Sequence, residues 1–241
     1  MRNGRAAPRT AIAKPSPPST STLKDLESHL AGRTRLTVTE VEIGGKTYRI
    51  THPDQADALI NEEEFDNDER LPYWADLWPS AKALARWLSK EDLRGKRVLE
   101  LGCGLGLPAV VCVSGGAEVV VSDQYEAALD FAVYNARDNE GRSPKTFMFD
   151  WRRPEVDGLG TFDLVLGADI LYEALSGLSL AELVPRLLAP GGEAVFADPV
   201  RNTAAVFLDG MEERGFRVET ESAFVEQAGK MVEVRVHRLR N

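Results

Sequence analysis

A glycine-rich stretch is the part of this sequence that most directly suggests a bound ligand. Residues 98–106 read VLELGCGLG, with Gly102, Gly104 and Gly106 at alternate positions between an expected strand and an expected helix. Glycine lets the backbone approach a ligand closely, and the N-terminus of the following helix offers N–H groups without partners. In open α/β sheets, ligands bind at the carboxyl ends of strands, so the stretch predicts a nucleotide-like ligand there.

Two details separate this stretch from the dinucleotide-binding fingerprint. The glycines follow the spacing G-x-G-x-G and precede Leu107-Pro108, whereas the fingerprint requires G-x-G-x-x-G. Glu100 lies just upstream of the first glycine. A carboxylate there would repel a pyrophosphate, but it suits a ligand that carries an ammonium and a sulfonium charge and no phosphate. The alternative for Glu100 is a solvated side chain at the end of a strand.

The next two expected strands also end in side chains suited to a nucleoside. Asp123 lies 21 residues after Gly102, where a carboxylate can accept hydrogen bonds from both hydroxyls of a ribose, as it also does in NAD-binding proteins. The third strand ends in Asp150-Trp151. A carboxylate can accept the exocyclic amine of adenine, and an indole offers a face on which the ring stacks. The alternative for Trp151 is an ordinary core aromatic residue.

Strands alternate with helices from Gly95 onward, and this alternation predicts the sheet that positions these residues. It implies an α/β fold, with a doubly wound and mostly parallel seven-stranded sheet covered by helices on both faces. Only residues 225–230 lie between the last two strands, so these should form an antiparallel hairpin at one edge. The expected strands are residues 97–101, 118–122, 145–149, 162–168, 193–197, 216–222 and 232–239, and the expected helices are residues 107–114, 125–139, 178–188 and 202–214.

The segments before this domain differ from it in composition. Residues 1–24 are rich in proline, serine and threonine and predict a disordered tail, with an organelle transit peptide as the alternative. Residues 25–70 contain an alternating stretch, 35–51, around a pair of glycines, which predicts a β-hairpin, and then an acidic loop at residues 61–70. The hairpin is expected to recognise a substrate, to form a dimer contact or merely to cover the main domain, residues 71–241.

Composition narrows the partners that the protein can have. The chain of 241 residues carries a net charge of −9, which disfavours nucleic acid and makes a basic partner easier to bind. No apolar run reaches the roughly 18–20 residues that span a bilayer, so an integral membrane protein is not expected. Cys103 and Cys112 lack CxxC or metal-ligand spacing, which predicts a cytoplasmic protein without a metal site, or a mitochondrial matrix protein if the tail is a transit peptide. The scattered histidines are expected to have surface or packing roles.

Four motifs taken together, VLELGCGLGLP, SDQY, FDW and GADILY, resemble those of the seven-strand class I S-adenosylmethionine-dependent methyltransferases. Within that class, the chain from about Pro72 onward is similar to the protein lysine methyltransferases and their bacterial relatives. The resemblance implies S-adenosylmethionine as cofactor and adds Cys103 and Gln124 to the cofactor-binding residues. The segment LPYWADLWPSAKALARWL is similar to the lead-in helix of that branch. This implies that Trp78 lies beside the cofactor and leaves Trp74 undecided.

The motif GADILY also implies where the methyl acceptor binds. In the family the D-x-x-Y element lines the acceptor pocket, so the backbone of Ala168 should lie along the cofactor, with Asp169 and Tyr172 facing the nucleophile. The N-P-P-Y form favoured by nucleic-acid amino-methyltransferases is absent from the sequence. The run from Asp198 to Arg201 (DPVR) resembles bacterial members of the branch, and its alternative is a simple turn at a strand end.

These observations favour an enzyme that methylates an amine nitrogen, with a protein lysine side chain as the first choice of acceptor. Asp169 would accept a hydrogen bond from the amine and stabilise the positive charge that builds on it, and Tyr172 would shape the pocket. A small-molecule amine is the enzymatic alternative, and a non-catalytic cofactor-binding adaptor is the alternative from another class. A dinucleotide oxidoreductase is opposed by Glu100 and by the glycine spacing. The acceptor, the number of methyl groups added and the oligomeric state stay open.

Overall fold

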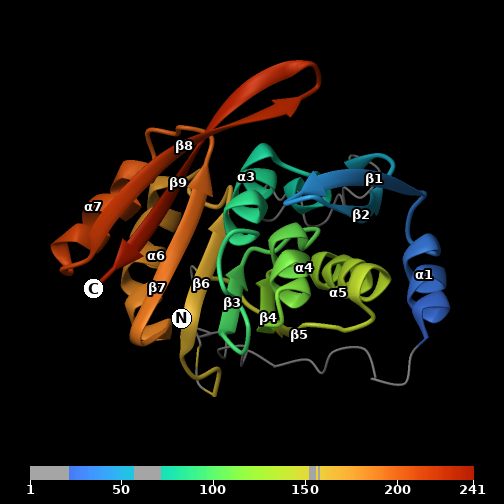
Figure 1. The fold of residues 1–241 in the computed structure, drawn as a ribbon, viewed down its shortest axis with the longest axis horizontal. Helices are drawn as coiled ribbons and strands as arrows, with labels where there is room; N and C mark the ends of the chain where they lie inside the picture. Colours follow the sequence, from blue (N-terminus) through green and yellow to red (C-terminus); the bar gives the residue numbers. More distant parts are fainter. Residues whose placement is uncertain (1–21, 57–71, 152–155, 157) are drawn as a thin grey trace, which may run out of the picture.

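A seven-stranded sheet forms the centre of the molecule. The computed structural model describes residues 22–56, 72–151, 156 and 158–241, and within them the strand order is β5-β4-β3-β6-β7-β9-β8 (Figure 1). Strands β5, β4, β3, β6 and β7 are parallel, and β9 and β8 are antiparallel at one edge. The predicted fold class is confirmed. The strands are β3 (Arg97–Leu101), β4 (Glu118–Asp123), β5 (Lys145–Met148), β6 (Phe162–Ala168), β7 (Leu188–Asp198), β8 (Arg217–Gln227) and β9 (Lys230–Arg240).

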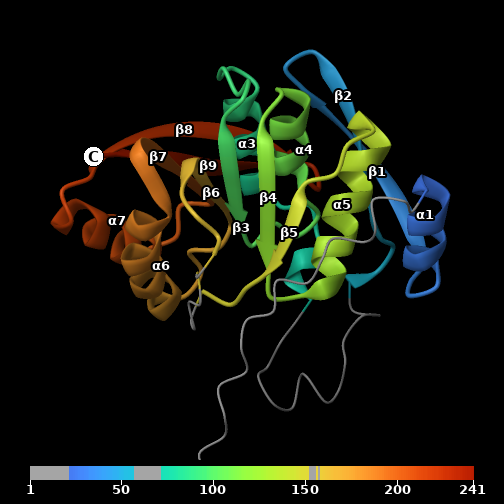
Figure 2. The same ribbon diagram turned by 90° about the horizontal axis from the view of Figure 1, so that it is seen from below.

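Helices cover both faces of this sheet, as Figures 1 and 2 show. Side chains of the central strands alternate between two apolar cores, with Leu164 and Leu166 in one and Val165 in the other. A strand buried on both faces is apolar at successive positions, which explains the apolar run Leu164–Leu166 of β6. Helices α3 (Pro79–Leu88), α4 (Leu107–Ser114) and α5 (Glu126–Glu140) pack on one face, and α6 (Ala174–Leu187) and α7 (Ala204–Glu213) pack on the other.

The strand order reverses between β3 and β6. β3 pairs with β4 on one side and with β6 on the other, so the loops that follow these strands diverge and leave a crevice at their carboxyl ends. Ligands of open α/β sheets bind at such a reversal. The glycine stretch follows β3 and the GADILY motif follows β6, so both predicted motifs reach this crevice.

The edge hairpin is longer than the sequence pattern predicts. β8 and β9 pair along their whole length, from Arg217 opposite Arg240 to Gln227 opposite Lys230. A two-residue turn, Ala228-Gly229, joins them, and both of its residues have positive φ (50° and 75°). This turn matches the right-handed twist of the strands, so pairing continues to the tip. Figure 1 shows the hairpin extending beyond the rest of the sheet. Its tip is anchored to α3, where Arg86 donates to the Phe224 carbonyl at 3.2 Å.

The predicted N-terminal hairpin is present as β1 (Leu36–Ile43) and β2 (Lys46–Pro53). Its turn is Gly44-Gly45, again with positive φ at both residues (58° and 81°). The apolar side chains of one face, Val41, Ile43, Tyr48 and Ile50, are buried in the core that α3 and α5 share. Within this chain the hairpin therefore covers helices, which is one of the three roles that the sequence left open.

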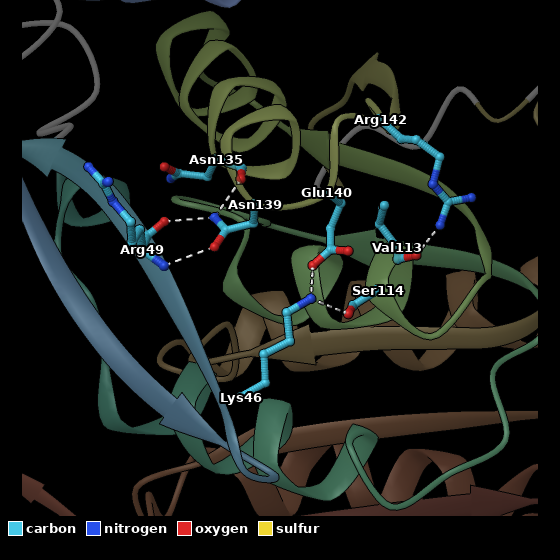
Figure 3. A network of polar contacts seen from close by, with 8 residues as sticks. All are labelled: Lys46, Arg49, Val113, Ser114, Asn135, Asn139, Glu140 and Arg142. Atoms are coloured by element: carbon cyan, nitrogen blue, oxygen red, sulfur yellow. Dashed lines mark hydrogen bonds and ion pairs between the residues drawn. The ribbon is translucent and has the colours of Figure 1, made fainter.

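Two asparagines attach the hairpin to α5. Asn135 and Asn139 are one helical turn apart. Asn135 pairs with the backbone N–H and C=O of Thr51 at 2.8 Å and 3.0 Å. Asn139 pairs with the same groups of Arg49 at 2.9 Å and 2.8 Å, as Figure 3 shows. The carboxamides thus satisfy the free edge of β2 much as a neighbouring strand would. Asn135 also donates to the carbonyl of Leu105 at 2.9 Å, so it joins the hairpin to the glycine stretch.

One helix lies before the hairpin and differs from the sequence expectation. α1 (Leu23–Ala31) begins within the last residues of the segment expected to be a tail, and Thr22 and Asp25 form a capping box at its start. Leu26 and Leu30 are its buried residues, one turn apart, and they hold the helix against the domain. The rest of the expected tail (1–21) and the acidic loop (61–70) lie outside the described residues.

Candidate functional site

A cavity of about 440 Å³ opens at the carboxyl ends of β3, β4 and β6. It brings together twelve of the thirteen residues that the sequence selected, so residues up to 94 positions apart line one space. Asp150 is the exception, and its predicted contact with an adenine amine stays a prediction. The twelve are Trp78, Glu100, Gly102, Cys103, Gly104, Gly106, Asp123, Gln124, Trp151, Ala168, Asp169 and Tyr172.

The glycines of the loop are required by the protein itself. Gly102, Gly104 and Gly106 have φ of 62°, 50° and 75°, values that residues with a side chain rarely adopt. The close approach of a ligand, predicted from the sequence, stays a prediction, and the chain itself already leaves no room for side chains at these positions. An added Cβ would lie 2.7 Å from Ile170 at position 102, 3.0 Å from the Trp74 carbonyl at position 104 and 2.7 Å from Ala132 at position 106.

Glu100 occupies the helix end that a phosphate would need. Its side chain is buried, and its Oε2 accepts a hydrogen bond from the backbone N–H of Ala109 in the first turn of α4 at 2.9 Å. A carboxylate at this position stabilises the positive end of the helix dipole and excludes a second anion. Burial raises the pKa of Glu100 to about 8, against the lowering effect of the Ala109 hydrogen bond. This end of the cavity therefore favours a cation.

Asp123 fixes the loop from the neighbouring strand. Its side chain accepts hydrogen bonds from the backbone N–H groups of Gly104 at 3.1 Å and Tyr125 at 3.0 Å. Burial raises the pKa of Asp123 to about 6 in spite of these bonds. Glu100 and Asp123 thus place two poorly solvated carboxyl groups on one cavity, and a positively charged ligand would stabilise the ionised form of both.

Trp151 carries an unsatisfied donor at the cavity. Its side chain is 7% exposed, and its indole Nε1–H has no hydrogen-bond partner within the described part of the chain. Buried donors are rarely left unpaired in native proteins, so this one calls for an acceptor on a ligand or a water. The ring edge faces Gly102, where an added Cβ would lie 3.2 Å and 3.3 Å from two of its atoms.

Two further tryptophans line the cavity from the segment before α3. Trp78 is held in place because its Nε1–H donates to the carbonyl of Tyr73 at 2.7 Å. Trp74 packs against Phe131 and Tyr125, with ring centroids 5.6 Å and 6.4 Å apart. Trp74 was left undecided on sequence grounds, and the structure places it at the cavity with its carbonyl against the glycine loop.

Asp169 also lines the cavity and has a strained backbone conformation. Its φ is 62°, and its side chain is 8% exposed. Oδ2 accepts a hydrogen bond from the Ser80 hydroxyl at 3.0 Å, and Oδ1 forms an ion pair with Arg201. Burial raises the pKa of Asp169, while Arg201 and Ser80 act against that rise. Tyr172 lies nearer to solvent, 41% exposed at the mouth.

Arg201 and Ser80 are the site residues that the sequence argument missed. The role of the run from Asp198 to Arg201 was left open there, and Ser80 was not considered. The available signal was positional: β7 lies beside β6, so residues that follow both strands meet at the same sheet edge. The side chain of Arg201 lines the cavity from that edge.

Among the described residues, no group of three or more His, Cys, Asp or Glu side chains could hold a metal ion. None of the helices in the same residues is long and apolar enough to cross a membrane.

Comparison with known proteins identifies the family. Residues 60–214 match the lysine methyltransferase family. The protein N-lysine methyltransferase METTL21A of Danio rerio is 39% identical over 127 residues, which cover 50% of this chain and 55% of that protein. The EEF1A lysine methyltransferase 3 of Mus musculus is 28% identical, with 71% and 74% covered. The histone-arginine methyltransferase METTL23 of Xenopus laevis is also 28% identical, with 56% and 60% covered.

Solved structures agree on the fold. The N-methyltransferase NodS of Bradyrhizobium japonicum, in complex with S-adenosyl-L-homocysteine, has a TM-score of 0.54 at 20% identity and covers 75% of this chain and 95% of its own. The magnesium protoporphyrin IX methyltransferase of Synechocystis, with the same product bound, has a TM-score of 0.53 at 16% identity, with 67% and 81% covered. The chain spans between 53% and 62% of the length of the first three curated relatives. By the family match over residues 60–214, the chain belongs to the lysine methyltransferase family.

Proposed function

We propose that this protein transfers a methyl group from S-adenosylmethionine to a lysine side chain of a protein. The observation that carries the proposal is a single cavity with two kinds of lining residue. Glu100 and Asp123 are buried carboxyl groups suited to a cation, and Asp169 and Tyr172, which follow β6, line the same space. One continuous space thus offers a place for a charged donor and a place for an amine.

The residues present fit the cofactor. S-adenosylmethionine carries positive charge and no phosphate, which suits the buried Glu100 that already occupies the α4 N-terminus. Asp123 is the last residue of β4, where a carboxylate can accept the ribose hydroxyls. The Nε1–H of Trp151, which has no partner among the described residues, offers a donor to a polar ligand atom. When bound, the cofactor supplies an electrophilic methyl group.

The part of the cavity lined by Asp169 and Arg201 is suited to hold an amine. Only the neutral form of an amine is nucleophilic, so the pocket has to position it while its proton leaves. Asp169 can accept a hydrogen bond from the amine and stabilise the positive charge that develops on nitrogen. The adjacent Arg201 guanidinium disfavours a protonated amine at the same place, because like charges repel at short range. Positioning the two reactants and excluding water are then the main tasks of the protein.

Transfer of tritiated methyl groups to a proteome tests the proposal. Extracts incubated with labelled S-adenosylmethionine and the purified protein should yield a labelled protein whose hydrolysate contains methyl-lysine. Label confined to small molecules would contradict the protein substrate, and methyl-arginine would contradict the lysine. Calorimetry with S-adenosylhomocysteine and with NAD(H) is the accompanying control, since heat from NAD(H) alone would overturn the cofactor assignment.

A further inference from the structure

A strained turn carries Arg201 to the cavity. The turn follows β7 as Asp198-Pro199-Val200-Arg201, and Val200 in its centre has φ of 60°. A β-branched residue is a genuine outlier in this region, and such a conformation is strained. Strain of this kind persists only where surrounding contacts enforce it. The contacts that enforce it here identify what the turn is built to hold.

Asp198 is the first of these contacts. It is 1% exposed, and its Oδ1 accepts a hydrogen bond from the backbone N–H of Arg201 at 2.6 Å, which closes the turn. Its Oδ2 lies 2.9 Å from Nε2 of His237, which is 3% exposed on β9. The Nδ1 atom of His237 in turn lies 2.8 Å from the Thr220 hydroxyl of β8. A chain of polar contacts, buried at His237 and Asp198, thus runs from the edge hairpin to the backbone of Arg201.

The other end of the turn is tied to the motif that follows β6. The Arg201 guanidinium pairs with Asp169, and the hydroxyl of Thr203 donates to the carbonyl of Leu171 at 2.5 Å. The backbone N–H of Asp169 donates to the carbonyl of Ala197 at 2.9 Å. Asp169, like Val200, has positive φ, so one strained residue belongs to the ion pair and the other directly precedes its arginine.

We propose that Arg201 is a positioning residue for the methyl acceptor, and that the buried Asp198–His237 pair holds the turn that directs its guanidinium to Asp169. The inference rests on the proposed function, because it takes Asp169 as the group that meets the acceptor. Fixed in this way, Arg201 holds one carboxylate oxygen of Asp169 and leaves the side chain a single orientation toward the cavity. The opposing influence of Arg201 on the raised pKa of Asp169 agrees with this role.

The contacts among Thr220, His237, Asp198 and Arg201 form a clamp on the turn. This clamp reaches beyond the part of the chain that matches the family. Asp198 and Arg201 fall within residues 60–214, whereas Thr220 and His237 lie outside them, on the antiparallel edge hairpin. The edge hairpin therefore acts on the site through a buried histidine. This gives β8 and β9 a function in addition to completing the sheet.

A double-mutant cycle tests the proposal. His237→Phe removes both polar contacts of the ring at similar size, and Arg201→Met removes the guanidinium. Each variant should lower kcat about tenfold or more and leave the affinity for S-adenosylhomocysteine unchanged within about twofold. The double variant should be no slower than Arg201→Met alone, because the effects of residues that act through one another do not add. His237→Gln, which keeps a donor for Asp198, should restore most of the rate.

His52→Phe is the matched control. His52 is also a histidine of an antiparallel hairpin that bonds a threonine hydroxyl, Thr39 Oγ1 at 2.9 Å, but it belongs to β2, which does not contribute to the cavity lining. It should leave kcat unchanged. Rate losses that multiply in the His237/Arg201 double variant, or equal losses of cofactor binding and kcat in His237→Phe, would overturn the proposal.

Hydrogen exchange separates this inference from the proposed function. The Arg201 amide should be protected in the wild type and exchange at least about tenfold faster in His237→Phe, with the amides of β3 and β6 unchanged. This measurement needs no methyl acceptor. If the wild type methylates no lysine but the Arg201 amide responds, the proposed function fails and the clamp stands. If the Arg201 amide exchanges at the same rate in the wild type and in His237→Phe, the inferred role of His237 is overturned, whatever the methyl acceptor is.

Discussion

At the scale of single residues, the site is made of carboxyl groups held where water cannot solvate them well. Glu100, Asp123 and Asp169 all have pKa values raised by burial, and in each case hydrogen bonds or a cation act against the rise. Neighbours that only partly compensate burial leave a group responsive to the charge of a ligand. We therefore expect the first two groups to respond to the cofactor, and Asp169 to respond to the proposed acceptor and to Arg201.

Binding of S-adenosylmethionine should release protons. The pKa of Glu100 is about 8, so at neutral pH the ligand-free protein holds a proton there, and a bound cation favours the carboxylate. About one proton per site should leave at pH 7. Calorimetry in two buffers of different ionisation enthalpy measures this number. Glu100→Gln should abolish the difference between buffers, and equal heats for the wild type would contradict the assignment.

Asp169→Ala should separate catalysis from cofactor binding. Removing a group that stabilises developing charge costs about 10²–10³-fold in kcat. The affinity for S-adenosylhomocysteine should change little, because the proposed function places Asp169 beside the acceptor rather than the cofactor. Single-turnover rates and calorimetry on the same preparation decide the matter. Parallel losses of rate and affinity would place Asp169 at the cofactor instead.

Arg201→Met should also move the acid limb of the rate profile. Arg201 and Ser80 lower the pKa of Asp169, whereas burial and the nearby Asp198 raise it. Without the guanidinium the pKa rises further, so Asp169 takes up a proton at higher pH and activity is lost earlier as pH falls. The pH dependence of kcat for the two proteins gives the shift. An unchanged acid limb would mean that Asp169 is not the group that titrates.

At the scale of elements, the glycine stretch is positioned by its neighbours on both sides. Asp123 fixes it from β4, and Asn135 of α5 fixes it through the carbonyl of Leu105. Because Asn135 also holds both backbone groups of Thr51, the N-terminal hairpin shares this support. The hairpin, for which the sequence left three roles open, is therefore bonded to the same helix that supports the glycine stretch.

Asn135→Ala should destabilise the protein and Asn139→Ala should not do so to the same degree. The first change leaves the Thr51 N–H and the Leu105 carbonyl unpaired in a buried place, which costs about 2–4 kcal/mol in the free energy of unfolding. Asn139 makes the same pairing with Arg49 at an exposed position, where water replaces it at about 1 kcal/mol or less. Urea unfolding compares the two. Equal losses would contradict a buried role for Asn135.

Local patterns were enough to predict the central elements of the sheet. The bounds of β3, α4 and β6 agree with the sequence expectation to the residue, because buried strands have continuous apolar runs and a Gly-Leu-Pro step marks a helix start. α1 was missed because its capping box uses Asp25 and its apolar face holds only two buried leucines. Arg201 was missed because its place depends on strand order and on the strained Val200, which no local preference predicts.

At the scale of the whole molecule, the buried carboxyl groups give stability a definite dependence on pH. The pKa of Glu100 rises from 4.5 to about 8 on folding, and that of Asp123 from 3.8 to about 6. Over these intervals the folded chain retains protons that the unfolded chain has lost. The contribution of both groups to stability is therefore largest at low pH and is lost as pH rises.

The ligand-free protein should accordingly lose stability between about pH 5 and pH 8, and Glu100→Gln should flatten this dependence. Thermal unfolding across that range, with and without saturating S-adenosylhomocysteine, measures the effect. The ligand should offset part of the loss, because its ammonium group favours the ionised carboxylates. A wild-type stability that rises steadily with pH over the same range would contradict the assignment.

The attachment of β2 to α5 has a consequence for how much of the chain can be removed. The region that matches the family, residues 60–214, contains neither the N-terminal hairpin nor β8 and β9. A chain trimmed to that region would uncover the core that Ile43 and Ile50 fill, leave Asn135 without Thr51, and lose His237. We therefore expect the smallest autonomous folding unit to extend from α1 to β9, well beyond the segment by which the family is recognised.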